Sequence, residues 1–212
     1  MTTVVTGIFG GYDVPKPPLE QSVDCDFILY TDDPALEAPG WNKVCVPQDG
    51  RHPRLAAKEP KLRPWRHFPG PWIWIDGSFE ITSTTFVAEA VEATTGPLGQ
   101  WTHPWRDCVY AEASASIPLI KYANTPIRDQ AASYRRLGHP GHWGLWATGL
   151  IVYTEPLLTL ADLWWAELNR WGFQDQISQP VALAAAGLRP VALPGGLHQS
   201  PWLRWHSHRN EL

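Results

Sequence analysis

The stretch WIWIDGS, residues 72–78, ends an apolar run with a carboxylate, Asp76. A carboxylate that leaves a buried strand is costly unless a positive group or hydrogen-bond donors meet it. Two further segments, IFGGYD at 8–13 and YTDD at 30–33, also follow apolar residues and end in acidic side chains. Ligands of open α/β sheets bind at the carboxyl ends of the strands, so these segments predict a binding edge with Asp76 at its centre. A turn or helix-capping role is the alternative for an isolated Asp of this kind.

Basic side chains are concentrated over residues 51–66, between YTDD and WIWIDGS. They are Arg51, Arg54, Lys58, Lys61, Arg63 and Arg66. Guanidinium and ammonium groups bind phosphate oxygens, and a carboxylate can hold a divalent metal on the same phosphates. The segment therefore indicates a clamp for a phosphorylated ligand beside Asp76, and a solvated basic helix face is the alternative.

Histidines near the C-terminus offer a further ligand for such a metal. His198, His206 and His208 lie there, and an imidazole beside a carboxylate suits Mn²⁺, which accepts mixed nitrogen and oxygen ligands. An inert surface position is the commoner role of a histidine. The sequence has no G-x-S-x-G, G-x-x-x-x-G-K-[ST], H-E-x-x-H or G-x-G-x-x-G motif, which argues against the hydrolase, P-loop, zinc-protease and dinucleotide-binding classes.

The composition of the 212 residues is that of one globular domain, which we place over residues 1–212. Hydrophobic residues make up 44% and charged residues 18%, and the net charge of −4 gives no support for a general nucleic-acid-coating role. The 13 tryptophans are many for this length, so we expect some of them to line a ligand cleft. Candidates for stacking on sugar or base rings, although core packing is the commoner role, are Trp101, Trp105, Trp143 and Trp146.

Cysteine usage and the N-terminal segment bear on the compartment. The 3 cysteines form no C-x-x-C pair, which argues for a reducing environment rather than a disulfide framework or a zinc site. Residues 1–13 have no basic stretch before their apolar run and read as a strand rather than a signal peptide. No stretch approaches the ~20 apolar residues of a membrane span. We therefore expect a soluble cytoplasmic protein with no membrane partner.

Apolar periodicity and turn signals predict strands that alternate with helices. The predicted strands are 4–9, 27–31, 43–46, 72–75, 150–153 and 191–193, with an extended segment at 103–113. The predicted helices are 84–94, 126–137, 157–171 and 175–186, together with helical pieces in 51–68 that break at Pro60 and Pro64. The alternation indicates an α/β sheet that is covered on both faces.

Several segments, taken in order along nearly the whole chain, resemble one known family. They are TGIFGGYD (6–13), YTDDP (30–34), RHPRLAAKEPKL (51–62), WIWIDGSFEI (72–81), HPWRDCVYAEA (103–113), IRDQAASYRRLGHP (127–140), GLWATGLIVYT (144–154), WWAE (164–167), QDQIS (174–178) and, more loosely, WHSHRN (205–210). The family is the glycosyltransferase-like domain of plant pectin- and pollen-related enzymes, which also has bacterial and phage members. Its members are similar to GT-A-fold nucleotide-sugar transferases, so the resemblance implies a single GT-A-like α/β domain with a mixed, mostly parallel sheet flanked by helices.

The resemblance also implies roles for individual residues. It implies that the nucleotide pocket is formed by Phe9, Gly10, Gly11, Tyr12, Asp32 and Arg54, and that the diphosphate is bound by Lys58 and Lys61. It assigns Mn²⁺ or Mg²⁺ to Asp76, Ser78 and His208, with His206 as the substitute for His208. Ser78 stands where metal-binding relatives carry a second acid, and a hydroxyl is the poorer ligand. Asp175 and Gln176 are assigned to the sugar or acceptor, and an N-cap is the alternative role for Asp175.

The function that the resemblance implies is a metal-dependent glycosyltransferase. Such an enzyme moves a sugar from a nucleotide-diphosphate donor, most commonly UDP-linked, to a hydroxyl of a glycan, protein, metabolite or modified DNA base. The catalytic residues would be Asp76, Asp175 and Gln176, and Glu112 and Glu167 are further candidates for contacts to the sugar or for proton transfer. The alternatives are a phage-type DNA-base glycosyltransferase that acts on hydroxymethylated bases, and a non-catalytic carbohydrate- or nucleotide-binding module.

Overall fold

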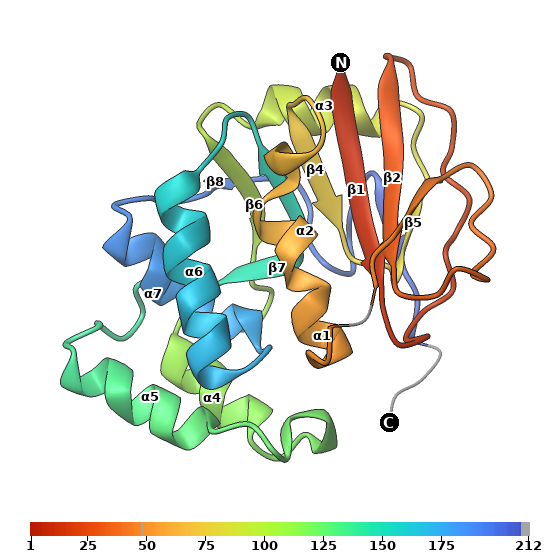
Figure 1. Ribbon diagram of the computed structural model, residues 1–212. Helices are drawn as coiled ribbons and strands as arrows, with labels where there is room; N and C mark the ends of the chain where they lie inside the picture. The colour runs from red at the N-terminus through yellow and green to blue at the C-terminus, as the bar shows by residue number, and fades with distance from the viewer. Residues whose placement is uncertain (48, 209–212) are drawn as a thin grey trace.

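The computed structural model describes residues 1–47 and 49–208, and within them seven strands form one sheet (Figure 1). The strands are β1 (Thr2–Ile8), β2 (Cys25–Thr31), β3 (Asn42–Cys45), β4 (Trp72–Ile75), β6 (Leu98–Thr102), β7 (Trp146–Tyr153) and β8 (Val191–Ala192). Their order across the sheet is β3-β2-β1-β4-β7-β6-β8. Strand β7 runs antiparallel to both of its neighbours, and the other pairs are parallel. The sheet is therefore mixed and mostly parallel, as predicted, and β4 is its central strand.

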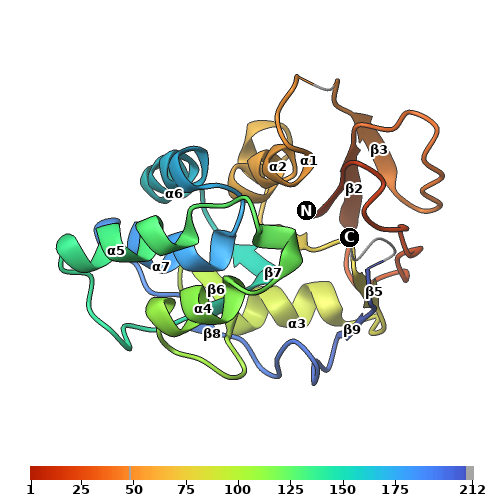
Figure 2. The same cartoon turned by 90° about the horizontal axis from the view of Figure 1, so that it is seen from below.

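Helices cover both faces of this sheet (Figure 2). The helices are α1 (Pro53–Ala56), α2 (Lys58–Leu62), α3 (Phe86–Ala93), α4 (Val109–Ser116), α5 (Ile127–Arg136), α6 (Leu158–Trp171) and α7 (Asp175–Ala185), with short 3-10 turns at Pro64–Arg66 and Ile120–Tyr122. Helix α3 packs on one face, and α2, α6 and α7 pack on the other. Helices α4 and α5 pack with α7 in a separate small core. The predicted α/β class, with helices on both faces, is confirmed.

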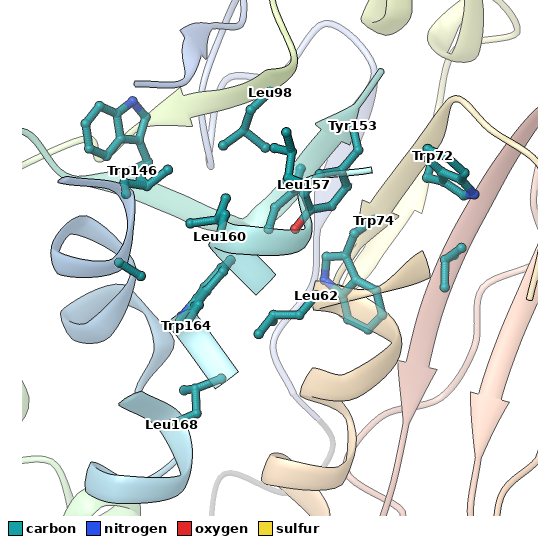
Figure 3. Packing of buried hydrophobic residues seen from close by; sticks show 14 of the residues in the cluster. Leu62, Trp72, Trp74, Leu98, Trp146, Tyr153, Leu157, Leu160, Trp164 and Leu168 are labelled. Atoms are coloured by element: carbon teal, nitrogen blue, oxygen red, sulfur yellow. The ribbon is translucent and has the colours of Figure 1, made fainter. Parts of the chain in front are cut away.

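The sequence of β4 explains how one strand serves two cores. Side chains alternate between the faces of a strand, so Trp72 and Trp74 point to one side and Ile73 and Ile75 to the other. The two tryptophans join the cluster under α2 and α6, where Trp74 lies beside Leu62 (Figure 3). All four residues of β4 are buried, which is typical of a strand that is covered on both faces.

A second, two-stranded sheet lies beyond the end of β4. Strand β5 (Phe79–Ile81) pairs antiparallel with β9 (Leu203–Trp205), and Phe79 lies opposite Trp205. The backbone N–H of His206 donates to the carbonyl of Ser78 at 2.9 Å. The pairing therefore brings the C-terminal part of the chain next to the residues that follow Asp76 (Figure 2).

Most of the predicted strands and helices are confirmed within a few residues of their predicted bounds. The extended conformation predicted for 103–113 is wrong from residue 109 onwards, because Val109 and Ala113, four residues apart, bury one face of α4 against α5 and α7. The predicted break at Pro60 is also wrong. Pro60 is the third residue of α2, where a backbone N–H has no partner within the helix to lose.

Three short strands, β5, β6 and β9, were not predicted from the sequence. Each has three to five residues, and two of them exist only through the pairing of 79–81 with 203–205. None of the helices in the described part of the chain has the length and apolar character that a membrane crossing requires.

Candidate functional site

Asp76 follows the last residue of β4 and is held there by two hydrogen bonds. Its backbone N–H donates to the carbonyl of Gly149 at 2.8 Å, which fixes the chain against β7. The indole N–H of Trp74 donates to Asp76 Oδ1 at 2.7 Å, since residues two apart on a strand share a face. The carboxylate is thus anchored to the sheet while 38% of the side chain remains exposed.

The positive group that meets Asp76 is the ammonium of Lys61. Lys61 Nζ lies 3.3 Å from Asp76 Oδ1 and 2.7 Å from Asp175 Oδ2, and the side chain of Lys61 is almost inaccessible to solvent. Helix α2 packs against β1, and the hydroxyl of Tyr153 donates to the backbone carbonyl of Lys61 at 3.1 Å. These contacts hold the ammonium at the end of β4 even though the group is costly to bury.

Asp175 is the first residue of α7 and joins the two predicted lysines. Its Oδ2 lies 2.7 Å from Lys58 Nζ and 2.7 Å from Lys61 Nζ. An acidic residue at the N-terminus of a helix is also stabilised by the helix dipole. Lys58, Asp175, Lys61 and Asp76 therefore form a row of alternating charges, which we call the charge row.

Burial and pairing shift the pKa values along the charge row in opposite directions. Burial alone would raise the pKa of Asp175, but the ammonium groups of Lys58 and Lys61 hold that pKa well below its usual range. Burial lowers the pKa of Lys58, and pairing with Asp175 only partly offsets this. The pKa of Lys61 is raised, because its two carboxylate partners outweigh the effect of burial. Asp175 is consequently a weak proton acceptor, and the geometry favours a positioning role for it.

A cleft of about 540 Å³ opens at this edge of the sheet. Many of the residues predicted for the site line it, namely Tyr12, Arg54, Lys58, Asp76, Ser78, Asp175, Gln176 and His208. They come from the loop after β1, from α1 and α2, from the end of β4, from the start of α7 and from the C-terminal part of the chain. Lys61 lies behind this lining, where it contacts Asp76 and Asp175.

A second hollow, of about 380 Å³, lies between α1–α2 and the ends of β2 and β3. Phe9 and Asp32, which were predicted for the nucleotide pocket, line this hollow rather than the cleft. The N–H of Gly10 donates to the Asp32 carboxylate at 2.9 Å, and Gly10 has a φ of +63°. A side chain at Gly10 would be strained, and its Cβ would also lie 3.0 Å from Pro53. Gly11 continues the same turn, also with a φ of +63°.

The predicted metal ligands do not form one ligand set in the described part of the chain. Ser78 is only 2% exposed, and Asp76 Oδ1 already accepts from Trp74 and Lys61. His208 Nδ1 lies 3.0 Å from Asp13 Oδ2, and His206 pairs with Glu80. Among residues 1–47 and 49–208, no group of three His, Cys, Asp or Glu side chains is arranged to hold a metal ion. The side chains as arranged therefore do not fit a preformed Mn²⁺ or Mg²⁺ site.

Asp13 ends the predicted segment 8–13, but its sequence context gives no individual role for it. Asp13 lines the cleft and is 6% exposed. Its Oδ1 has no hydrogen-bond partner among the described residues, and its Oδ2 faces His208. A buried carboxylate oxygen without a donor is unusual, so Asp13 meets the cost of burial that the sequence predicts for Asp76.

Another part of the cleft lining centres on Glu112, one of the two further acidic candidates. Arg106 donates to Glu112 Oε2 at 2.6 Å, and His103 Nε2 lies 3.5 Å from the same oxygen. Burial lowers the pKa of His103, although Glu112 opposes the shift. The other candidate, Glu167, accepts a hydrogen bond from Tyr134 and does not line the cleft.

No protein-family model, no curated protein and no solved structure matches the chain. The fold defines a class, an α/β protein with a mixed, mostly parallel sheet. The site adds a cleft at the carboxyl end of the central strand, with paired charges along one wall.

Proposed function

We propose that the protein is a glycosyltransferase that takes a sugar from a nucleotide-diphosphate donor, with UDP-linked sugars as the first donors to test. The observation that carries the proposal is the charge row of Lys58, Asp175, Lys61 and Asp76 beside a cleft at the carboxyl end of the central strand. This edge is where open α/β sheets bind their ligands. A GT-A-like fold is part of the same proposal, supported by the mixed sheet and by the small β5–β9 sheet.

The cationic side chains of the cleft suit a diphosphate leaving group. Transfer of the sugar builds negative charge on the departing phosphates, and fixed positive groups near that charge lower the barrier. Lys58 lines the cleft, and Asp175 holds its ammonium in place at 2.7 Å. Arg54 lines the same cleft with its guanidinium 4.5 Å from the centre of the Tyr12 ring. In this proposal Lys58 and Arg54 bind the diphosphate. Asp175 holds Lys58 in position, and Lys61 in turn pairs with Asp175.

The hollow beside the cleft suits the nucleobase. Its walls include the aromatic side chains of Phe9 and Tyr30, and the carboxylate of Asp32 lies among them. An apolar pocket with a few polar groups is the usual form of a site for a planar ring, and a carboxylate there can accept a hydrogen bond from a base N–H. Phe9 and Pro53 line the hollow, whereas Tyr12 and Arg54, close to them in the chain, line the cleft, so one donor would cross from the hollow to the cleft at these residues.

Asp76 is the acidic side chain of the charge row that is most open to the cleft, with 38% of it exposed. In this proposal the Asp76 carboxylate accepts hydrogen bonds from hydroxyls of the sugar, and Lys61 compensates the charge of the carboxylate. The residues present do not form a metal site by themselves, so no step of the proposed transfer passes through a metal. Dependence on Mn²⁺ or Mg²⁺ remains a prediction from the family resemblance, and the binding assay tests it directly.

The assay is a thermal-unfolding screen of the whole chain with nucleoside diphosphates and UDP-linked sugars, each with Mn²⁺ and with a chelator. A ligand present at about 100 times its Kd stabilises the folded state by about 2.7 kcal/mol, which corresponds to a rise of roughly 5–10 °C in Tm. We expect at least one nucleotide to give such a rise. In Lys58→Ala most of this nucleotide-induced rise should be lost, when the Tm with ligand is compared with the Tm of the same variant without ligand.

Arg136→Ala is the matched control, since Arg136 is an exposed cation on α5 that does not line the cleft. It should keep the full nucleotide effect. If no nucleotide raises the Tm of the wild-type protein, with or without Mn²⁺, the proposal fails. A rise with sugars alone, and none with nucleotides, would instead indicate a carbohydrate-binding module.

A further inference from the structure

The mouth of the cleft carries an aromatic surface that the proposed donor chemistry does not use. Trp105 is 65% exposed and Trp205 is 39% exposed, and both line the cleft together with His198. The ring of His198 lies between them, with centroids 5.5 Å from Trp105 and 5.6 Å from Trp205. We call these three side chains the aromatic mouth.

Exposure of these indoles is costly, and the other tryptophans of the chain are all buried or half-buried. Trp101, Trp164 and Trp202 are each no more than 2% exposed. An indole contributes strongly to stability when it is buried, so two partly exposed indoles on either side of His198 give up that contribution. Adjacent exposed apolar side chains at the entrance of a cleft are typical of a surface that a ligand covers.

The structure holds the aromatic mouth in place before any ligand arrives. The backbone N–H of Trp105 donates to His103 Nδ1 at 3.3 Å, and the guanidinium of Arg106 lies 5.9 Å from the Trp105 ring. Trp205 is the last residue of β9 and pairs with Phe79 of β5, two residues after Gly77. Trp205 is therefore tied to the segment that follows Asp76, and a ring that stacks on the aromatic mouth would share the cleft with Asp76 and Lys58 of the charge row.

The charges beside the aromatic mouth indicate which kind of ring it takes. Arg106 is neutralised by Glu112 at 2.6 Å, and Arg204, next to Trp205, pairs with Glu80 at 3.4 Å. A DNA acceptor would need cations for its phosphates, and the net charge of the chain is −4. A sugar ring needs no such cations, because it offers C–H groups to an indole face and hydroxyls to nearby polar side chains.

We propose that the aromatic mouth is the acceptor subsite and that the acceptor is a carbohydrate whose pyranose ring stacks on Trp105 and Trp205. The inference rests on the proposed glycosyltransferase function and narrows its acceptor from any hydroxyl compound to a glycan or glycoside.

The test is a transfer assay with the full chain and the nucleotide sugar that it hydrolyses best. The acceptors are 4-nitrophenyl glycosides of glucose, galactose, xylose, mannose and N-acetylglucosamine, and a DNA duplex that contains 5-hydroxymethylcytosine. The quantity measured is the ratio of sugar transferred to acceptor to sugar released to water. We expect transfer to at least one glycoside, with the ratio reduced about tenfold in Trp105→Ala and in Trp205→Ala. Trp105→Phe keeps an aromatic face and should recover part of the loss.

Leu137→Ala is the control, since Leu137 is 73% exposed and does not line the cleft, and it should leave the ratio unchanged. The inference is overturned if the modified DNA is the acceptor and the glycosides are not, if no glycoside in the panel accepts sugar, or if both alanine variants keep the wild-type ratio. Donor hydrolysis separates the two claims. A wild-type protein that hydrolyses a donor but transfers to no glycoside contradicts only the acceptor subsite, whereas one that uses no donor contradicts the glycosyltransferase function as well.

Discussion

Lys61 and Asp175 lie 114 positions apart in the chain, yet their charged groups meet at 2.7 Å with side-chain exposures of 1% and 7%. The pair joins α2 to the start of α7 at one wall of the cleft. Taking two charges out of water costs free energy that close pairing must offset, so the removal of one partner leaves an uncompensated buried charge. The contact therefore links the stability of the fold to the geometry of the site.

Replacing Lys61 should destabilise the fold strongly. Lys61→Met keeps an unbranched side chain but leaves Asp76 and Asp175 without their shared ammonium. We expect the free energy of unfolding, measured by urea denaturation, to fall by about 3–5 kcal/mol. Arg66→Met is the control, because Arg66 is 49% exposed and its pair with Glu59 should contribute at most about 1 kcal/mol. Equal losses in the two variants would show that the buried pair has no special role.

Acid should destabilise the protein through Asp175. The pKa of Asp175 is held below its usual range in the folded state by Lys58 and Lys61, against the effect of burial. A carboxyl whose pKa is depressed by folding stabilises the protein above its unfolded pKa of about 3.9, and that stabilisation is lost as the pH falls.

The measurement is the free energy of unfolding of wild type and Asp175→Asn between about pH 6 and pH 3. The free energy of unfolding should fall more for the wild type than for the variant over this range, because the asparagine side chain of the variant cannot take up a proton. Parallel curves for the two proteins would rule out Asp175 as a source of the acid sensitivity.

Trp74→Phe should impair the site more than the same change at Trp72. The indole of Trp74 donates to the Asp76 carboxylate at 2.7 Å, whereas that of Trp72 donates to the neutral carbonyl of Phe68 at 2.8 Å. Hydrogen bonds to charged groups contribute about 1.5–3 kcal/mol and neutral ones about 0.5–1.5 kcal/mol. We expect donor turnover to fall about tenfold in Trp74→Phe, a change of about 1.4 kcal/mol in barrier height, and less in Trp72→Phe. Equal turnover in the two variants would argue against a role of Trp74 in orienting Asp76.

Local patterns in the sequence were sufficient for six of the seven strands of the main sheet and for most helices. The all-buried WIWI run and the FILYT run predicted β4 and β2, because strands that are covered on both faces must be apolar throughout. Strands β5 and β9 depend on a partner more than a hundred residues away, so their short sequences carry no comparable signal.

The candidate site was only partly predictable for the same reason. The acidic ends of the strands and the basic segment indicated which residues gather at the edge, since the chemistry of a charge is visible in one sequence. The distances between these residues could not be predicted from the sequence. The sequence therefore suggested a metal as the partner of Asp76, whereas in the structure Lys61 Nζ lies 3.3 Å from Asp76 Oδ1. The exposure of Trp105 and the pairing of His208 with Asp13 likewise follow from the tertiary fold.

The most direct test of the account is the release of nucleoside diphosphate from a panel of nucleotide sugars by the wild-type protein and by Asp76→Asn, with Mn²⁺ and with a chelator. The account predicts that the wild type cleaves at least one donor and that Asp76→Asn, which keeps the size of the side chain but not its charge, is slower by a factor on the order of 100. Cleavage of no donor under either condition, or equal rates for the two proteins, would contradict it.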